Sequence, residues 1–377
     1  MSKMKKGLLM FLFSIFALGT ILAACGQADD NEVETPADTG DTGEEVEDGE
    51  GTAEDTGDFV AKMVTDEGGV DDLSFNQSAW EGLKQFGEDF GVEVDYQQSS
   101  DASDYAPNLN RLARDPETSI AFAIGFLMED DIRSVAQQHT DKQFAIVDTV
   151  VTDDDDNTIP NIANITFAEH QGSFLVGVVA GLQTETDHVG FIGGVESGLI
   201  KKFENGFKAG VKAVNPDATV SVQYAQSFND AATGQSIANT FYSNGADIIY
   251  HASGGTGNGV FSEAINRARN GENVWVIGVD RDQHEEGEWA DGNVTLTSMV
   301  KRVDQAVYQV SQMTMEGNFP GGEILEFELA DHGVGIAEST ENVSEEILSA
   351  VDEWTQRILD GEFEVPQTDE EFEEFEI

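Results

Sequence analysis

Two short apolar runs of the chain each end in an aspartate. Residues 274–280 (VWVIGVD) end in Asp280, and residues 142–148 (KQFAIVD) end in Asp148. Each run predicts a strand buried on both faces, and open α/β sheets bind ligands outside the carboxyl ends of their strands. The Asp280 carboxylate could there accept two hydrogen bonds from a ligand diol. We therefore expect two similar lobes with a binding cleft between them.

The loop after the first predicted strand leads to an aromatic side chain beside an amide. Residues 59–64 (FVAKMV) predict that strand, and Phe75 and Asn76 lie at the start of the next predicted helix, which Ser74 could cap through Gln77. Phe75 could stack on a flat ligand ring while the Asn76 amide binds the edge of that ring. The alternative is that Phe75 is only a hydrophobic staple for its helix.

Three further loops follow predicted strands and carry candidate ligand contacts. The glycine-rich segment SGGTGNG includes Gly254, and the segment SFND includes Phe228, a second aromatic residue. Glycines let backbone N–H groups approach a ligand; the alternative is a phosphate-binding loop, but the lysine of that motif is missing. Lys301 could donate to a ligand hydroxyl or pair with Asp280, and the alternative is a solvated lysine at a helix start.

Catalysis, metal binding and cofactor binding have little support in the sequence. The six histidines are scattered without HExxH spacing, no GxSxG segment occurs, and Cys25 is the only cysteine. The aspartate run at 153–156 lacks the alternating ligand spacing of a calcium loop. We therefore expect a protein that is not an enzyme and that uses neither a metal nor a cofactor.

Predicted strands and helices alternate along most of the chain, which indicates an α/β fold with parallel sheets. Residues 168–182 are apolar on nearly all sides and predict a helix packed deep between the lobes. We expect an N-terminal lobe at 59–165 with returning C-terminal segments, a C-terminal lobe at 166–320, and a crossover segment at 321–377. The acidic tail from Asp360 is expected to be peripheral. Strands are expected at 59–64, 92–96, 119–124, 143–148, 188–192, 219–224, 248–252, 274–280 and 294–299.

The chain is strongly acidic, with 19 Lys and Arg against 73 Asp and Glu, which gives a net charge of −54. Such a surface repels nucleic acid and anionic lipid, so neither is an expected partner. The hydrophobic content of 39% is too high for a fully disordered chain. An acidic excess of this size on a folded protein is typical of adaptation to high salt, which predicts a halophilic host.

The start of the chain combines lysines, an apolar run at 7–22 and the sequence LAAC, which ends at Cys25. This pattern is typical of a secretory signal, and LAAC resembles a bacterial lipobox, whose cysteine is lipidated. We expect a lipoprotein signal peptide at 1–24 and lipidation of Cys25, with an uncleaved membrane anchor as the alternative. Residues 26–58 contain fourteen acidic residues and no basic ones, so 25–58 should form a flexible tether. The body should lie at the extracytoplasmic face of the cell membrane.

Several segments, in order, resemble the basic membrane protein (BMP) family, the lipoprotein substrate-binding components of ABC transporters, which include purine nucleoside receptors. The matching segments are GGVDDLSFNQSAWEGLKQF, SFLVGVVAGL, VGFIGGVESGLIKKFENGFKAGVKAVNP, ADIIYHASGGTGNGVFSEA, VIGVDRDQ and TSMVKRVDQAV. The resemblance runs from about Phe59 to Ile358. It implies a type I periplasmic-binding-protein fold, in which two Rossmann-like lobes joined by a hinge close on a nucleoside.

The resemblance also implies how the nucleoside would be bound. The base would lie between two aromatic rings, of which Phe75 fits the first and Phe228 the second, with Phe203 as the weaker choice. Asp280 would bind the ribose hydroxyls, helped by Gly254 and Lys301. The family usually has a proline in the segment that matches ESGLIKKF, and this chain has none there.

The remaining residues implied by the resemblance come from the first lobe. Asp148 and Asn76 would bind the base or line the cleft, and Asp71 and Asp72 are further candidates in the first loop. The implied function is that of a monomeric, membrane-tethered receptor that delivers a nucleoside, most simply a purine nucleoside, to the permease and ATPase of an ABC importer. The alternatives are a nucleoside sensor for a signalling protein and an extracellular nucleoside hydrolase.

Overall fold

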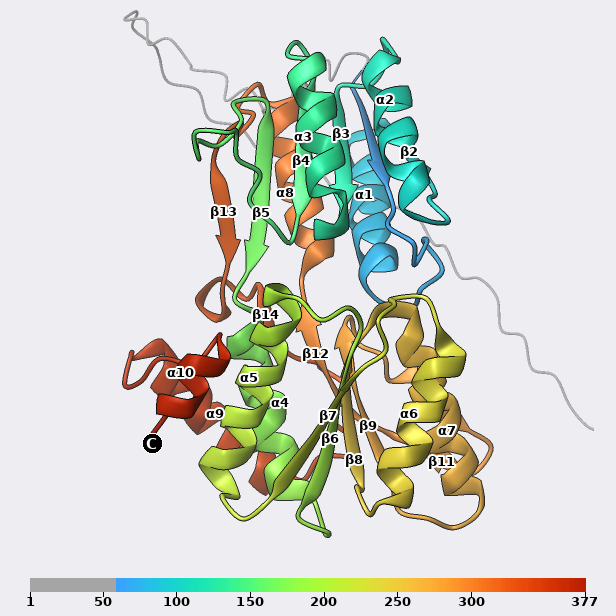
Figure 1. Cartoon of the computed structure of the whole chain (residues 1–377), viewed down its shortest axis with the longest axis vertical. Coiled ribbons are helices and arrows are strands. Elements are labelled where there is room, and N and C mark those ends of the chain that lie inside the picture. Colours follow the sequence, from blue (N-terminus) through green and yellow to red (C-terminus); the bar gives the residue numbers. More distant parts are fainter. Residues whose placement is uncertain (1–58) are drawn as a thin grey trace, which may run out of the picture. The chain divides into compact units, whose positions relative to one another are not determined.

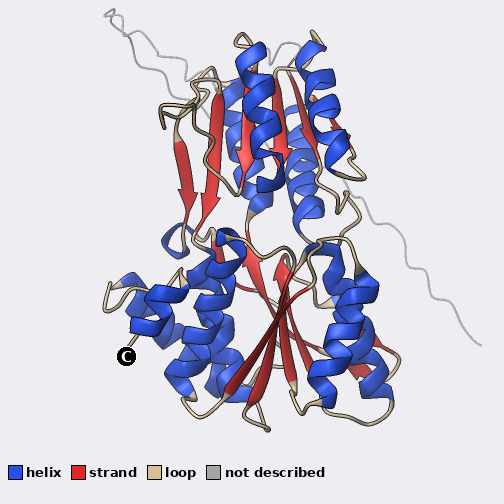
Figure 2. Cartoon of the chain, in the orientation of Figure 1, coloured by secondary structure: helices blue, strands red, loops and turns tan. Residues whose placement is uncertain are grey.

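The structure, a computed structural model, describes residues 59–377, which form two open sheets flanked by helices (Figures 1 and 2). The predicted signal peptide, the tether and Cys25 lie outside the described residues. Each helix within 59–377 is too short or too polar to span a membrane.

The first sheet consists of parallel strands in the order β13-β5-β4-β3-β1-β2. Its central strands are apolar on both faces: in β3, Phe122 and Ile124 join one core, whereas Ala121 and Ala123 join the core on the opposite face. Burial on both faces explains the continuous apolar runs of the sequence. The strands are β1 (Val60–Val64), β2 (Glu93–Gln97), β3 (Ile120–Ile124), β4 (Gln143–Val147), β5 (Ile162–Phe167) and β13 (Ile324–Phe327).

The second sheet repeats this arrangement in the order β14-β12-β9-β8-β6-β7, with β14 antiparallel at the edge. Here Phe191 and Tyr250 join one core, and Ile192 and Ile249 the other. The strands are β6 (His188–Gly193), β7 (Thr219–Tyr224), β8 (Ile248–Ala252), β9 (Trp275–Asp280), β12 (Thr295–Lys301) and β14 (Val334–Ile336). A separate hairpin pairs β10 (Glu288–Trp289) with β11 (Gly292–Asn293).

Helices cover both faces of each sheet, and each sheet with its helices is called a lobe below. The first lobe contains α1 (Phe75–Phe90), α2 (Tyr105–Arg114), α3 (Glu129–Gln138) and α8 (Val303–Met315). The second lobe contains α4 (Glu169–Gln183), α5 (Gly198–Val214), α6 (Ala231–Ser243), α7 (Gly257–Arg269), α9 (Glu345–Leu359) and α10 (Asp369–Glu374).

The expected end of the C-terminal lobe at 320 differs from the structure, because α8 lies in the first lobe beside α1 (Figure 1). A methyl group on Gly82 would lie 2.0 Å from the Asp304 carbonyl oxygen, so these helices approach closely. β13 then joins the first sheet and β14 the second, so the chain crosses between the lobes after β5, after β12 and after β13. A strand followed by a helix has the same sequence pattern in either lobe. The alternation of strands and helices in the sequence therefore did not reveal that the chain crosses to the first lobe between β12 and α8.

The apolar helix expected between the lobes, α4, is buried inside the second lobe instead. It packs against the helices α5 and α9 and against the strands β12 and β14. Glycines allow α4 and α5 to touch: a methyl group on Gly210 would lie 2.0 Å from the Phe174 carbonyl oxygen, and one on Gly177 would lie 2.4 Å from that of Phe207. Apolarity on all sides therefore reflects enclosure within one lobe.

The acidic tail is packed on α5 rather than peripheral as expected. Lys208 lies over the ring of Phe372 at 4.2 Å, and the Lys212 ammonium donates to the Phe375 carbonyl oxygen at 2.7 Å. Phe363 and Phe375 also contact the core ring of Phe174. The aromatic residues among the acidic ones thus bind the tail to a helix that carries several lysines.

The close contact of α4 with α5 gives a stability prediction. Gly210→Ala should destabilise the protein by about 1–3 kcal/mol, because its methyl group meets a backbone carbonyl that cannot move without shifting a helix. Gly198→Ala is the matched control on the same helix, since its methyl group would meet no described atom within 4 Å. Urea unfolding of both variants measures the difference, and equal stabilities would contradict this packing.

Candidate ligand-binding site

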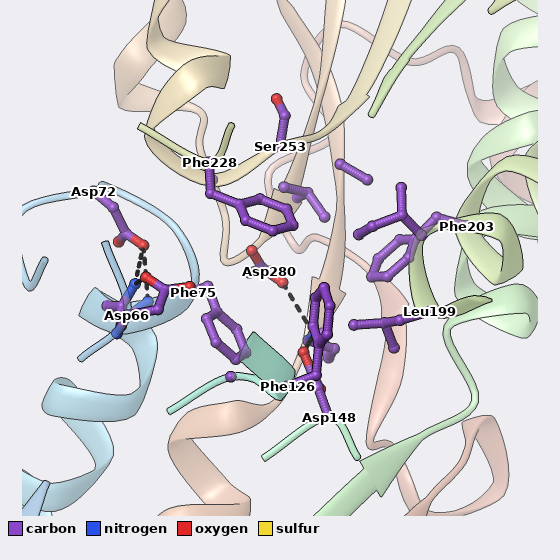
Figure 3. A pocket seen from close by; sticks show the side chains of 17 residues that line it. Asp66, Asp72, Phe75, Phe126, Asp148, Leu199, Phe203, Phe228, Ser253 and Asp280 are labelled. Carbon is purple, nitrogen blue, oxygen red and sulfur yellow. Dashed lines mark hydrogen bonds and ion pairs between the residues drawn. The ribbon is translucent and has the colours of Figure 1, made fainter. Parts of the chain in front are cut away.

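A cavity lies where the carboxyl ends of strands from both sheets meet (Figure 3), and the empty space in it and at its mouth, open solvent included, is about 480 Å³. Eight of the ligand contacts named in the sequence prediction line it, so the structure brings these eight together. They are Asp72, Phe75, Asn76, Asp148, Phe228, Gly254, Asp280 and Lys301. Phe203, the alternative ring, also lines the cavity, whereas Asp71 is exposed on the surface. The ligand contacts assigned to the residues that line the cavity remain predictions.

Lys301 forms an ion pair across the two lobes. It ends β12 of the second sheet, and its ammonium lies 2.7 Å from Asp148 Oδ2, just beyond β4 of the first sheet, and 3.6 Å from Asp280 Oδ1. Burial alone lowers the pKa of Lys301, but the two adjacent carboxylates outweigh burial and raise that pKa well above its usual range. The ammonium also lies 4.6 Å from the centre of the Phe75 ring. Lys301 is therefore a permanent buried cation in the cavity wall, not a solvated lysine.

Asp280 lies at the centre of the cavity wall, as Figure 3 shows. Its Oδ2 accepts a hydrogen bond of 2.5 Å from the Ser74 hydroxyl of the first lobe. Burial raises the pKa of Asp280 to about 6, although the Lys301 charge and the Ser74 hydrogen bond both act to lower it. The backbone turns sharply after both strand-end aspartates, with φ of 68° at Asp280 and 73° at Asp148. This turn places each carboxylate at the edge of its sheet.

Two carboxylate oxygens near Lys301 are buried without a hydrogen-bond partner among residues 59–377: Asp148 Oδ1 and Glu169 Oε1. Asp148 lines the cavity, so a ligand donor could satisfy its free oxygen. Glu169, the first residue of α4, pairs with Lys202 at 3.2 Å, and burial raises the pKa of Glu169 to about 7. The described residues therefore provide no hydrogen-bond donor for either of these two buried oxygens.

The loop after β1 holds a carboxylate cluster that sequence reasoning only partly found. The Asn76 amide donates to Asp66 Oδ1 at 2.7 Å and to Asp72 Oδ2 at 3.0 Å, so Asn76 holds these two side chains in place. Asp66 lines the cavity but was not predicted; burial raises the pKa of Asp66 to about 7. Asp66 lies two residues after the end of β1, near the carboxyl end of a strand like Asp148 and Asp280, and this position could have indicated it from the sequence.

The predicted cap of α1 by Ser74 is wrong. Asp72 caps the helix, because its carboxylate accepts from the backbone N–H groups of Ser74, Asn76 and Gln77 at 2.9–3.1 Å. The Ser74 hydroxyl is thereby free to reach Asp280 of the other lobe. Both residue types cap helices well, and the sequence alone did not show which of them faced the helix.

Four phenylalanines surround the cavity: Phe75 and Phe126 from the first lobe and Phe203 and Phe228 from the second (Figure 3). Phe126, which follows β3 and was not predicted, meets Phe228 edge to face, with ring centres 6.1 Å apart. Gly254 has a φ of 54°, and a methyl group there would lie 3.1 Å from the Phe228 carbonyl oxygen. Gly254 therefore lets the glycine-rich loop approach the Phe228 backbone.

A hydrogen-bonded chain connects the cavity wall with the opposite lobe. Gln283 Oε1 accepts from the Val279 N–H at 2.8 Å, so the Gln283 amide nitrogen must be the atom that donates to the Leu73 carbonyl oxygen at 2.8 Å. His251 Nε2 also lies 3.1 Å from Gln283 Oε1, so this nitrogen carries the proton. Burial lowers the pKa of His251 to about 4, which keeps it neutral. The Ser253 hydroxyl then donates to His251 Nδ1, and Figure 3 shows this hydroxyl directed away from the rings.

The geometry of the described residues gives no support for a metal site. Within 59–377, no group of three or more His, Cys, Asp or Glu side chains is arranged to hold a metal ion. In the aspartate run, Asp153 Oδ1 accepts from the backbone N–H groups of Asp155 and Asn157 at 2.9 and 3.0 Å, so it stabilises a surface turn.

The ion pair across the lobes gives a second prediction. Lys301→Met leaves the buried Asp148 and Asp280 carboxyl groups without a cation, which should destabilise the protein by about 3–5 kcal/mol at pH 8. The pKa of Asp280, about 6 beside Lys301, rises further in the variant, so acid should relieve the penalty and the loss should be smaller at pH 5. Lys84→Met, at an exposed position on α1, is the control. A loss that is equal at both pH values would contradict the prediction.

Comparisons with known proteins agree with the predicted family. A family model described as ABC transporter substrate-binding protein PnrA-like (Bmp) matches residues 59–369. The Lactococcus lactis protein named ABC transporter nucleoside-binding protein BmpA is 41% identical over 321 residues, which cover 82% of this chain and 89% of the relative. A Listeria innocua protein named CD4+ T-cell-stimulating antigen is 45% identical over 375 residues, covering 96% of this chain and 99% of the relative.

Solved structures agree with the predicted fold. An ABC transporter solute-binding protein from Aeropyrum pernix K1 superposes with a TM-score of 0.74 at 25% identity, covering 84% of this chain and 96% of the other. A solute-binding protein from Agrobacterium vitis, bound with α-D-tagatopyranose, has a TM-score of 0.58 at 12% identity over 77% of this chain and 98% of the other, a likeness of fold alone. The predicted two-lobed α/β fold is confirmed, as is the prediction of a binding protein rather than an enzyme. The chain belongs to the Bmp family of ABC transporter substrate-binding proteins.

Proposed function

We propose that the cavity binds a nucleoside, with a purine nucleoside as the preferred ligand. The observation that carries the proposal is the combination, in one cavity, of aromatic rings with the Asp148–Lys301–Asp280 cluster and its free Asp148 oxygen. A nucleoside matches both features, since its base has flat faces for the rings and its ribose has hydroxyl donors for the carboxylates. The nucleoside-binding relative from Lactococcus lactis supports this ligand class.

In this proposal each lobe contributes one half of the binding site. Phe75 of the first lobe and Phe228 of the second flank the base, at roughly 1–3 kcal/mol of stacking energy. The ribose hydroxyls donate to Asp280, with Lys301 and Gly254 beside it, and charge-assisted hydrogen bonds contribute about 1.5–3 kcal/mol each. These terms together are sufficient for micromolar or tighter binding after the costs of ordering.

The first loop is proposed to bind the edge of the base. Asp66 and Asn76 both line the cavity, and we propose that Asp66 contacts the edge of the base, because the Asn76 amide nitrogen already donates to Asp66 and Asp72. Asp148, with its free oxygen, is the other acceptor on the first-lobe side of the cavity. A base that carries N–H donors on its edge fits such a set of acceptors.

Binding is proposed to be coupled to closure of the two lobes about the crossing segments. A ligand that contacts both lobes stabilises the closed form relative to the open form. As a substrate-binding protein of an ABC transporter, the chain delivers its ligand to the permease and ATPase. We further propose that it acts as a monomer at the extracytoplasmic face, tethered by a lipid on Cys25 and the acidic segment that follows, in a host adapted to high salt.

A ligand screen tests the proposed function. In high-salt buffer, ribonucleosides should raise the melting temperature, because they reach both the ring-lined and the carboxylate-lined parts of the cavity. Purine ribonucleosides should raise it most, because their bases offer the larger stacking surface. Free bases and free ribose, each of which occupies one part, should give small shifts. A shift with free sugars and none with nucleosides would reject the proposal.

The role of Asp280 gives a pH-dependent prediction. Because the pKa of Asp280 is about 6, its carboxylate loses its charge as the pH falls from 7 to 5, and inosine affinity should fall about tenfold over that range. Asp280→Asn should weaken inosine binding at pH 7 by roughly 10- to 100-fold and should show a smaller pH dependence. Calorimetric titrations measure both effects. Equal affinities of the variant and the wild type at pH 7 would refute this role.

A further inference from the structure

Glu67 of the first lobe makes several hydrogen bonds to the second lobe. Its Oε1 accepts from the Ser227 hydroxyl and from the Phe228 backbone N–H, both at 3.1 Å, and its backbone carbonyl oxygen accepts from the Asn229 amide at 2.9 Å. One residue thus binds three consecutive residues of the opposite lobe. Neither the sequence motifs nor the lining of the cavity had indicated Glu67.

The bonds of Glu67 lie directly beside the cavity. Asp66, its neighbour in the chain, lines the cavity from the first lobe, and Phe228 lines it from the second. The Glu67 carboxylate is therefore attached to the backbone of the residue whose ring is proposed to cover the ligand. Glu67 can therefore hold the Phe228 ring in position although Glu67 itself does not line the cavity.

The segment at 227–230 is already held by its own lobe. The Phe228 carbonyl oxygen accepts from the Thr256 N–H at 3.2 Å, and the Thr256 hydroxyl donates to the Ser227 carbonyl oxygen and accepts from the Asp230 N–H, both at 2.9 Å. These bonds do not depend on lobe closure, so the segment keeps its shape when the lobes separate. Glu67 accepts from three other donors of the segment: the Ser227 hydroxyl, the Phe228 N–H and the Asn229 side-chain amide.

We propose that Glu67 is a latch that joins the Phe228 segment to the first lobe only in the closed form and so sets how long the ligand is retained. This inference rests on the proposed function of the cavity. Ligand binding to the open form does not require the latch, whereas ligand escape requires its bonds to break first. Loss of the latch should therefore raise the dissociation rate constant and leave the association rate constant nearly unchanged.

The test compares the binding kinetics of inosine for the wild type and three variants by stopped-flow measurement. Glu67→Ala should raise the dissociation rate constant about 10- to 100-fold, with an association rate constant within about threefold of wild type. Glu67→Gln keeps an acceptor oxygen and should show a smaller increase. Glu88→Ala, at an exposed position on α1, removes the same type of side chain from the same lobe and should behave like wild type.

A second measurement separates this proposal from the ligand assignment. The ligand-free protein also samples the closed form, in which Glu67 accepts from the Phe228 N–H. Hydrogen exchange of residues 227–229 in the ligand-free protein should therefore be faster in Glu67→Ala than in the wild type and in Glu88→Ala, because the closed form of Glu67→Ala no longer protects this N–H. If the wild type binds no nucleoside, the proposed function is wrong, and hydrogen exchange alone then tests whether Glu67 holds the Phe228 segment. Unchanged exchange, or an unchanged dissociation rate constant in a wild type that binds inosine, would overturn the latch.

Discussion

The ion pair between Lys301 and Asp148 is the interaction on which the rest of the site depends. It joins the end of a strand in the second sheet to the end of a strand in the first, and both side chains are almost completely buried. A buried cation is tolerated only beside buried carboxylates, and Asp148 and Asp280 provide them. Because Lys301 also precedes the crossing into α8, the charge pair lies where the two lobes are covalently joined. The cavity is thus assembled around a charge cluster to which both lobes contribute.

The first-lobe loop at 65–74 supplies most of the remaining contacts across the cavity. Glu67 binds the Phe228 segment, the Leu73 carbonyl oxygen accepts from Gln283, and the Ser74 hydroxyl donates to Asp280. These partners lie at or just after the ends of two strands of the second sheet, β7 for Phe228 and β9 for Asp280 and Gln283, so the loop contacts two parts of the opposite wall. Such a set of polar contacts can be broken and remade at modest cost, which suits a protein that must both bind and release its ligand.

The sequence predicted the fold and most of the residues that line the candidate cavity, for a physical reason. Strands buried on both faces produce apolar runs that are easily recognised, and parallel sheets gather the residues that follow such runs at one edge. Asp148 and Asp280 were found in this way; Lys301 ends β12, and Phe228 lies in the loop after β7. The same rule, applied to every predicted strand, would also have found Asp66 and Phe126.

Other features could not be predicted because they depend on which surfaces meet in space. The place of α8 in the first lobe, the enclosure of α4 within the second and the packing of the acidic tail on α5 all follow from tertiary contacts with ordinary sequence patterns. Glu67 resembles many other acidic residues of this chain until the opposite lobe provides donors for it. Asp72 caps α1 in place of Ser74, whose hydroxyl has a partner across the cavity instead.

The most direct measurement of the central claim is a crystal structure grown with inosine. The account predicts density for the base between Phe75 and Phe228, with the ribose hydroxyls within hydrogen-bond distance of Asp280 and with the Lys301–Asp148 ion pair intact across closed lobes. Density for inosine outside this cavity, or closed lobes in which Lys301 and Asp148 are separated, would contradict it.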